Sequence, residues 1–214
     1  MVQSKRDVPH FYLASEAEVT ALMELRRQIN GIEGYPRVTL NHLVVAAVGV
    51  ALREMPQANR IWLDGRIVSF DSTDVGVAIS TPRGLFAPVL RDAGRIGIDR
   101  VASRADALAE AARTGKLTAN DMDGGAITVS NAGMFNVTRF APIVNPPQAA
   151  ILGVGSVREL FRPDADGRPS LKREMGLVLS CDHRILDGVA GLALLNRIID
   201  ILQAPLRLLR TGAA

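Results

Sequence analysis

The sequence predicts an α+β protein built as a two-layer sandwich around a mixed β-sheet. Strand-like and helix-like segments follow one another without the regular alternation that produces an all-parallel sheet. Residues 39–55 predict a helix that is apolar nearly all round ("LVVAAVGVAL"), so we expect this helix to be buried. Near the C-terminus, two long strand-like runs flank "RPDADGRPS" at 162–170, which is typical of a hairpin loop.

The N-terminal segments predict a strand that leads into a helix. "PHFYLASEAE" at 9–18 begins as a short strand, and Ser15 and Glu18 have the spacing of a capping box for the helix that follows. Gly31 is a plausible end of this helix. The apolar residues between these points fall on one helical face: Val19, Leu22, Met23 and Ile29.

The middle of the chain predicts short strands joined by turns. Asp64-Gly65 separates two strand-like runs within 60–70 and predicts a hairpin. The segment 131–148, which contains the Pro146-Pro147 pair, predicts a long loop. Further strands are expected at 74–80, 85–90, 126–130, 149–160 and 171–184, and further helices at 98–115 and 187–202.

Composition argues against several classes of function. Only three of the 25 basic residues are lysines, but the arginines are scattered and aromatic residues make up 4%, which disfavours a nucleic-acid-binding platform. The single cysteine, Cys181, excludes an intramolecular disulfide framework. No apolar run is long enough to span a bilayer, and the first ten residues lack a signal-peptide core. We therefore expect a cytoplasmic protein without membrane association.

The stretch "SCDHRILDGVAG" at 180–191 places an imidazole where a strand ends and a helix begins. Asp187 lies four residues after His183, and Gly188 follows it at the start of the helix. A carboxylate in this place can hydrogen-bond nearby backbone and fix the turn that holds the histidine. The residues therefore predict an imidazole presented at the rim of the sheet.

The pattern around His183 is open to other interpretations. A lone histidine at a strand end can be purely structural. Cys181 could form a nucleophilic pair with it, but side chains two residues apart on a strand point the same way rather than toward each other. A metal site would need more ligands, and His10 and His42 do not have ligand spacing, so we expect no metal.

A family resemblance distinguishes between these interpretations. "LSCDHRILDG" resembles the H-x-x-x-D-G signature of the chloramphenicol-acetyltransferase-like, CoA-dependent acyltransferases. Its Asp-His-Arg form is similar to the catalytic core of the dihydrolipoamide acyltransferases, the second component of 2-oxo acid dehydrogenase complexes. Four more blocks occur in the family's order and spacing, so that the resemblance covers nearly the whole chain: "PHFYL" (9–13), "TPRGLFAPVLRDA" (81–93), "GGAITVSNAGMF" (124–135) and "IVNPPQAAILGVG" (143–155).

The resemblance implies a role for each site residue. His183 would be the general base that takes the proton of the CoA thiol, and Ser130 would hydrogen-bond the tetrahedral oxyanion. Asp187 would orient the turn. The substrate channel would be lined by Asn131, Gly133 and Met134. CoA would be a substrate, and the lipoyl group would be carried on a separate domain or chain. The stretch "SNAGMFNVTRFAPIVNPPQAA" at 130–150 is more like the acetyl-transferring branch than the branched-chain or succinyl branches.

The resemblance also implies an assembly. The family's active site lies between subunits, so we expect a homotrimer with shared active sites. Trimers could join into a cage through apolar C-terminal residues: Leu206, Leu208 and Leu209. Expected partners are lipoyl domains and the decarboxylase and dihydrolipoamide dehydrogenase components. We expect a short N-terminal arm at 1–8 in place of most of the family's N-terminal helix, one catalytic domain at 9–209, and a polar tail at 210–214.

Two further functions remain open from the sequence. The shortened N-terminal segment would suit a scaffold that assembles with little or no turnover. A related acyltransferase with a small acceptor is disfavoured by the Asp-His-Arg form and by "NPPQAAILGVG". Retention of Ser130, His183 and Asp187 favours the enzyme.

Overall fold

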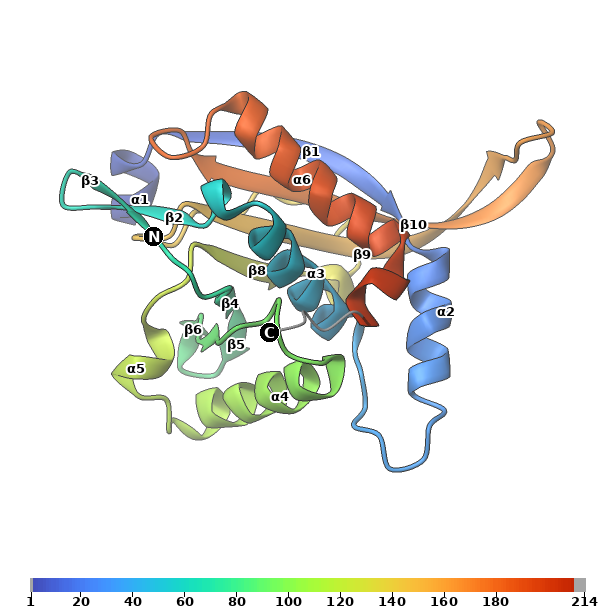
Figure 1. The fold of residues 1–214 in the computed structure, drawn as a ribbon, viewed down its shortest axis with the longest axis horizontal. Helices are drawn as coiled ribbons and strands as arrows, with labels where there is room; N and C mark the ends of the chain where they lie inside the picture. Colours follow the sequence, from blue (N-terminus) through green and yellow to red (C-terminus); the bar gives the residue numbers. More distant parts are fainter. Residues whose placement is uncertain (1, 210–214) are drawn as a thin grey trace.

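The structure is a computed structural model that describes residues 2–209. Its centre is a six-stranded sheet in the order β1-β10-β9-β8-β4-β7. β10 runs antiparallel to both of its neighbours, β8 lies parallel to β9 and β4, and β7 is antiparallel to β4. Figure 1 shows α3 and α6 crossing the same face of this sheet. The predicted α+β layered architecture with a mixed sheet is confirmed.

The elements occur in the following positions. The strands of the main sheet are β1 (His10–Glu18), β4 (Val75–Val77), β7 (Val89–Leu90), β8 (Ile127–Asn131), β9 (Ala150–Pro163) and β10 (Pro169–Asp182). Two small hairpins are formed by β2 (Arg60–Leu63) with β3 (Arg66–Ser69), and by β5 (Ile79–Thr81) with β6 (Gly84–Phe86). The helices are α1 (Val2–Asp7), α2 (Thr20–Ile29), α3 (Leu40–Glu54), α4 (Ile98–Thr114), α5 (Ala119–Met122) and α6 (Gly188–Gln203), with 3-10 turns η1 (Pro56–Ala58), η2 (Gly133–Phe135) and η3 (Pro205–Leu209).

The hydrophobic core lies between the helices and one face of the sheet. From His42 to Leu52 every residue of α3 is buried, as its all-round apolar sequence predicts. Side chains alternate along β10, so that Leu177, Leu179 and Cys181 join this core while the residues between them face the opposite side. The strand β8 alternates in the same way, with Val129 in the core.

The other face of the sheet is covered by the segment 136–149. The loop backbone lies so close to β9 that a Cβ on Gly155 would lie 2.0 Å from the Thr138 carbonyl oxygen. The segment is also joined to α1, because the Ser4 hydroxyl donates a hydrogen bond to the Val144 carbonyl. The long loop predicted from the sequence is therefore a packed second cover of the sheet.

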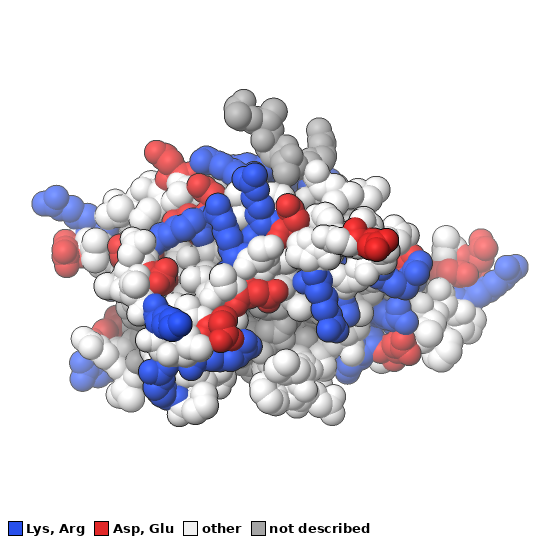
Figure 2. All heavy atoms as spheres, turned by 90° about the horizontal axis from the view of Figure 1, so that it is seen from below, with Lys and Arg blue, Asp and Glu red and all other residues white. Residues whose placement is uncertain are grey.

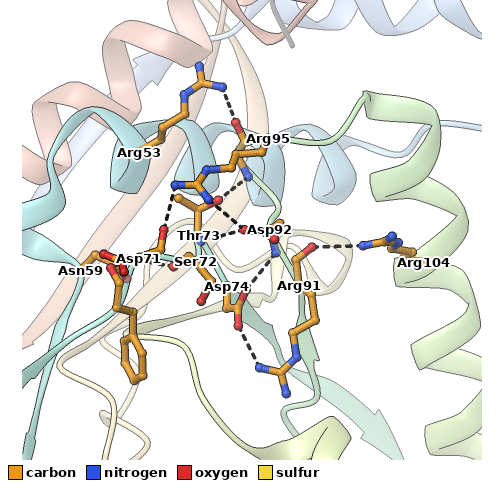
Figure 3. A network of polar contacts seen from close by, with 12 residues as sticks. Arg53, Asn59, Asp71, Ser72, Thr73, Asp74, Arg91, Asp92, Arg95 and Arg104 are labelled. Atoms are coloured by element: carbon orange, nitrogen blue, oxygen red, sulfur yellow. Dashed lines mark hydrogen bonds and ion pairs between the residues drawn. The ribbon is translucent and has the colours of Figure 1, made fainter. Parts of the chain in front are cut away.

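A polar network fixes the sheet edge next to β8. Asp74 is buried beside β4, and its carboxylate accepts hydrogen bonds from the Arg91 guanidinium and the Asp92 backbone N–H, at 2.8 and 2.9 Å. Arg91 also donates to the Asn120 carbonyl. The guanidinium of Arg53, from the end of α3, donates to the Gly94 carbonyl at the other end of this network (Figure 3). A buried carboxylate is stable only when paired and hydrogen-bonded in this way.

Some predicted boundaries are wrong. The predicted capping box at Ser15 and Glu18 does not form, because β1 pairs with β10 in an unbroken ladder as far as Glu18. The helix begins at Thr20, and the Glu18 carboxylate accepts a hydrogen bond from the Thr20 backbone N–H. The strand predicted at 74–80 is divided into β4, which belongs to the main sheet, and β5, which belongs to a separate hairpin. The strand predicted at 85–90 is divided into β6, in that hairpin, and β7, in the main sheet. The predicted arm at 1–8 contains α1, and the polar tail at 210–214 lies outside the described residues.

The surface around α4 carries both signs of charge. Figure 2, which views the molecule from below relative to Figure 1, shows basic side chains interspersed with acidic ones. On α4 itself the Arg113 guanidinium lies 3.9 Å from the Glu110 carboxylate. Among residues 2–209, none of the helices combines the length and apolar character needed to cross a bilayer.

Candidate active site

His183 follows the last residue of β10 and begins the turn into α6. Its backbone N–H donates to the Pro9 carbonyl at 3.0 Å, which extends the contact between β10 and the start of β1 by one residue. Its side chain is exposed, and its ring lies 5.0 Å from the Phe11 ring, centroid to centroid. The backbone is therefore held, while the side chain is open to solvent, as access to a substrate proton requires.

The residues on either side of His183 form a clamp. Asp182 is 2% exposed, and its carboxylate accepts hydrogen bonds from the backbone N–H and the guanidinium of Arg184. The guanidinium carbon of Arg184 lies 5.5 Å from the centre of the Trp62 ring, on the β2–β3 hairpin. Sequence reasoning identified the Asp-His-Arg triplet but missed Trp62, because no local pattern joins two residues 122 positions apart.

Asp187 caps α6. Its side chain accepts a hydrogen bond from the Ala190 backbone N–H at 2.8 Å, and its own backbone is extended. A carboxylate at this position satisfies one of the free N–H groups of the helix and complements the helix dipole. This geometry agrees with the predicted role of Asp187, which is to orient the turn between His183 and the helix.

Ser130 lies near the end of β8. It pairs with Gly153 of β9, and since Val129 points into the core, Ser130 points toward the opposite, loop-covered face. Its hydroxyl makes no side-chain hydrogen bond to any other part of the described chain. It is therefore available as a donor to a bound substrate.

The predicted channel residues form a turn after Ser130. The Asn131 side chain donates to Asn41 at the start of α3 and accepts from the Gly133 backbone N–H, at 3.3 and 2.8 Å. Gly133 lies against β9, where a Cβ would be 2.6 Å from the Gly155 carbonyl oxygen. Met134 is 84% exposed. Asn131 therefore has a structural role as well, and Asn41 was missed by sequence reasoning.

One chain does not bring Ser130 and His183 together. Ser130 pairs with Gly153 of β9, and Gly153 pairs with Val178 of β10. Val178 lies five residues before His183, which follows the end of β10. Two strand spacings across the sheet and five residues along it separate the two residues by roughly 20 Å. A serine donor and a histidine base must both lie about 3 Å from the same reacting group. A site that uses both therefore needs a second copy of the chain.

The geometry bears on two of the alternative interpretations of His183, the nucleophilic pair with Cys181 and the metal site. Burial raises the pKa of Cys181 to about 12, with a further contribution from the charge of Asp182, so the thiol stays protonated at neutral pH. His10 and His42 have other partners, since His10 contacts the Val8 carbonyl and His42 closes the capping box of α3. Within residues 2–209, no cluster of three potential metal ligands occurs.

Comparison with known proteins gives a consistent result. A family model described as 2-oxoacid dehydrogenases acyltransferase (catalytic domain) matches residues 1–210. The chain is 35% identical, over 98% of its length, to a mitochondrial dihydrolipoyllysine-residue acetyltransferase component of the pyruvate dehydrogenase complex from Dictyostelium discoideum. It spans 33% of the length of that protein, and between 33% and 42% of three such curated relatives.

Solved structures agree with this match. The chain is similar to the dihydrolipoamide acetyltransferase of Azotobacter vinelandii, solved in a study of the catalytic roles of one serine, one histidine and one asparagine. It is equally similar to the cubic core of a pyruvate dehydrogenase complex; for both, the TM-score is 0.91 and the identity 30%, over 98% of this chain and 87% of the other. Chloramphenicol acetyltransferase, at 17% identity and TM-score 0.60 over 91% of this chain and 89% of the other, shares the fold. The chain belongs to the family of 2-oxoacid dehydrogenase acyltransferase catalytic domains.

Proposed function

We propose that this chain transfers an acyl group, and specifically acetyl, between CoA and the dihydrolipoyl group of a 2-oxo acid dehydrogenase complex. The observation that carries the proposal is the spacing of its polar residues. In the Azotobacter enzyme the serine precedes the histidine by 52 positions and the asparagine follows it by four. Ser130, His183 and Asp187 are separated by 53 and four positions. The acetyltransferase names of the relatives support acetyl as the acyl group.

In the proposed reaction His183 accepts the proton of the CoA thiol. An imidazole titrates near pH ~6.5 and a thiol near pH ~8.5, so neutral histidine removes this proton at modest cost. The CoA sulfur attacks the carbonyl carbon of the acyl-dihydrolipoyl thioester, and the carbonyl oxygen gains a negative charge. Collapse of the tetrahedral intermediate breaks the old carbon–sulfur bond, and His183 returns its proton to the departing thiol. One thioester replaces another, so the reaction runs in both directions.

Ser130 stabilises the charge that develops in this step. Its hydroxyl donates to the oxyanion, and one such donor contributes about 3–4 kcal/mol of transition-state stabilisation. The turn at Asn131, Gly133 and Met134 borders the channel beside it. The clamp formed by Asp182 and Arg184, together with the cap formed by Asp187, holds the base.

The active site is formed by two copies of the chain within a homotrimer. The separation of roughly 20 Å between Ser130 and His183 supports a shared site. Met134 and Phe135, which are 84% and 71% exposed beside Ser130, form an apolar surface that a second copy would cover. Trimers join into a larger cage, by analogy with the cubic core that is a structural relative. Leu206 and Leu209 are exposed and available for this contact, but Leu208 is buried in its own chain, so its predicted role is wrong.

The proposal extends to the partners that such a complex requires. The lipoyl group is presented on a separate domain or chain. The decarboxylase component acts before the acyl transfer, and the dihydrolipoamide dehydrogenase component acts after it. These partners are supported by the name of the complex to which the relatives belong. The cytoplasmic location stays a prediction, and several relatives are mitochondrial.

Two experiments test the activity and the shared site. Purified protein is expected to transfer acetyl from acetyl-CoA to free dihydrolipoamide. Ser130→Ala and His183→Ala chains, each expected to be at least about 100-fold less active alone, are then co-expressed with different tags. Each site takes one half from each of two chains, so about a quarter of the sites in a random mixture are intact. Co-expression of Ser130→Ala with a chain carrying both substitutions is the control, and it gives no recovery.

The scaffold is the second candidate function. The exposed apolar residues Met134, Phe135 and Leu206 favour it as strongly as they favour the enzyme, because they report on assembly alone. A parent protein that forms a trimer in light scattering but transfers no acetyl would establish the scaffold. A monomer that transfers acetyl would contradict the shared site.

A further inference from the structure

The β2–β3 hairpin lies outside the main sheet but contacts the turn that carries His183. Figure 1 shows the hairpin beside the connection from β10 to α6. Trp62, at the third position of β2, places its ring over the Arg184 guanidinium, with 5.5 Å between the guanidinium carbon and the ring centre. Arginine binds aromatic faces both by stacking and by attraction to the ring quadrupole.

Arg184 joins this ring to the backbone of the base. Its Nε and Nη2 donate to the two oxygens of Asp182 at 2.9 and 2.6 Å, and its backbone N–H donates to Asp182 Oδ1 at 3.0 Å. The backbone of His183 lies between these two residues. The guanidinium is therefore tied, through Asp182, to the turn that carries the imidazole.

The Trp62 ring lies on the arginine side of the ion pair. The Arg184 side chain is 34% exposed while that of Asp182 is 2% exposed, so solvent can reach the pair from the arginine side. A ring on that side lowers the local dielectric and removes alternative orientations of the guanidinium. Without the ring, Arg184 can leave the bidentate geometry for water, and the turn loses its tie to the hairpin.

We propose that Trp62 is a positioning residue for His183, which acts through Arg184 and Asp182 and does not touch substrate. This inference rests on the proposed acyl transfer with His183 as base. A shift of about 1 Å in a catalytic group can lower a rate by about 100-fold. A loosened turn that still visits the productive position loses less, and we expect a decrease of about tenfold in kcat.

The kinetic test compares variants of the hairpin in the acetyl-transfer assay. Trp62→Leu is expected to lower kcat about tenfold, while KM for acetyl-CoA and dihydrolipoamide changes less than about twofold, because the substrate contacts remain. Trp62→Phe keeps an aromatic face and retains at least about a third of the parental kcat. Leu63→Ala is the matched control: it alters the neighbouring residue of β2, whose side chain points to the other face, and keeps the parental kcat.

A double-mutant cycle separates positioning from simple loss of structure. Arg184→Met removes the other partner, and the double variant Trp62→Leu/Arg184→Met is expected to be no slower than Arg184→Met alone, because both substitutions break one contact. Parental kcat in Trp62→Leu, equal losses in Leu63→Ala, or additive losses in the double variant would each overturn the proposal. Circular dichroism and light scattering check that every variant folds and assembles like the parent.

A fluorescence measurement tests the contact independently of activity. Trp62 is the single tryptophan of the chain, so its emission reports on this site alone. Arg184→Met is expected to change the emission and the quenching of Trp62 by acrylamide, whereas a distant substitution such as Arg113→Met is not. Identical quenching in the parent and Arg184→Met would show that the contact does not form. A parent protein without acetyl transfer would instead refute the proposed function, and with it the role of the contact in catalysis.

Discussion

The two halves of the proposed site are held in different ways. Around His183 the chain uses polar ties: a backbone bond to Pro9, the Asp182–Arg184 ion pair and the Asp187 cap. Around Ser130 the chain is held by the pairing of β8 with β9 and by one side-chain hydrogen bond, from Asn131 to Asn41. The turn that follows exposes the apolar side chains of Met134 and Phe135. The proposed base is therefore organised within its own chain, whereas Ser130 lies beside an exposed turn that a second chain completes in the proposed trimer.

The largest effect is expected from His183→Ala. Loss of a general base lowers kcat by about 10²–10⁴-fold. Because His183 is exposed and its ring lies beside Phe11 at the surface end of the strand, the unfolding midpoint stays close to that of the parent. Steady-state kinetics and thermal unfolding measure the two properties separately. Cys181→Ala is the control and keeps most activity, since the raised pKa of Cys181, about 12, makes a thiolate role unfavourable.

Ser130→Ala tests the half of the proposed site that contains the oxyanion donor. Removal of one oxyanion donor lowers kcat by about 10²–10³-fold. KM for CoA changes little, because the hydrogen bond strengthens only as the carbonyl oxygen becomes charged. A variant that raised KM and kept kcat would make Ser130 a binding residue. Thr128→Ser, two residues earlier on the same face of β8, is a control that keeps the hydroxyl to which Gln148 is bonded.

Local sequence patterns predicted most of the helices and strands. Periodicity identified α3, α4 and α6, because an apolar face that must be buried leaves a mark in the sequence at the spacing of a helix. The pattern failed at Ser15 and Glu18, where the capping spacing was present but pairing with a strand more than 150 residues away determined the conformation. Local propensity is overridden wherever a distant strand satisfies the backbone.

The site was predictable only in part for the same reason. Ser130, His183 and Asp187 were identified because the family resemblance carries them as short ordered blocks. Trp62 and Asn41 lie far from these blocks in sequence and meet them only in the folded chain. The separation of Ser130 from His183 follows from strand order and register, which periodicity does not determine.

Asp187 is expected to give an intermediate effect on the His183 half. Asp187→Ala removes the cap of α6 and destabilises the protein by about 1 kcal/mol. Asp187→Asn keeps a capping oxygen and retains most of that stability, and asparagine occupies the corresponding spacing in the Azotobacter enzyme. Chemical denaturation and kcat should change together across these variants if the residue acts by holding the turn. A large loss of kcat in Asp187→Asn without loss of stability would instead indicate direct contact with substrate.

The smallest effect is expected in the pH dependence of the protein's stability, through His42, which lies close in sequence to Asn41 on the Ser130 side of the proposed site. His42 lies in the first turn of α3, next to Asn41, and burial lowers its pKa below the usual value near 6.5, although Asp106 on α4 opposes this shift. The unfolded chain then binds a proton at a higher pH than the folded chain. Stability that is fully present above pH ~6.5 is therefore lost as the pH falls toward the lower folded-state pKa.

His42→Gln isolates this response. Glutamine at the same position of α3 can still accept the Thr39 backbone N–H in the capping box, but it does not titrate. Urea denaturation at pH 7.5 and pH 5.5 is expected to show a larger loss of stability in the parent than in His42→Gln. An equal response in the parent and His42→Gln would mean that Asp106 offsets burial, so that the pKa of His42 is the same in the folded and unfolded chains.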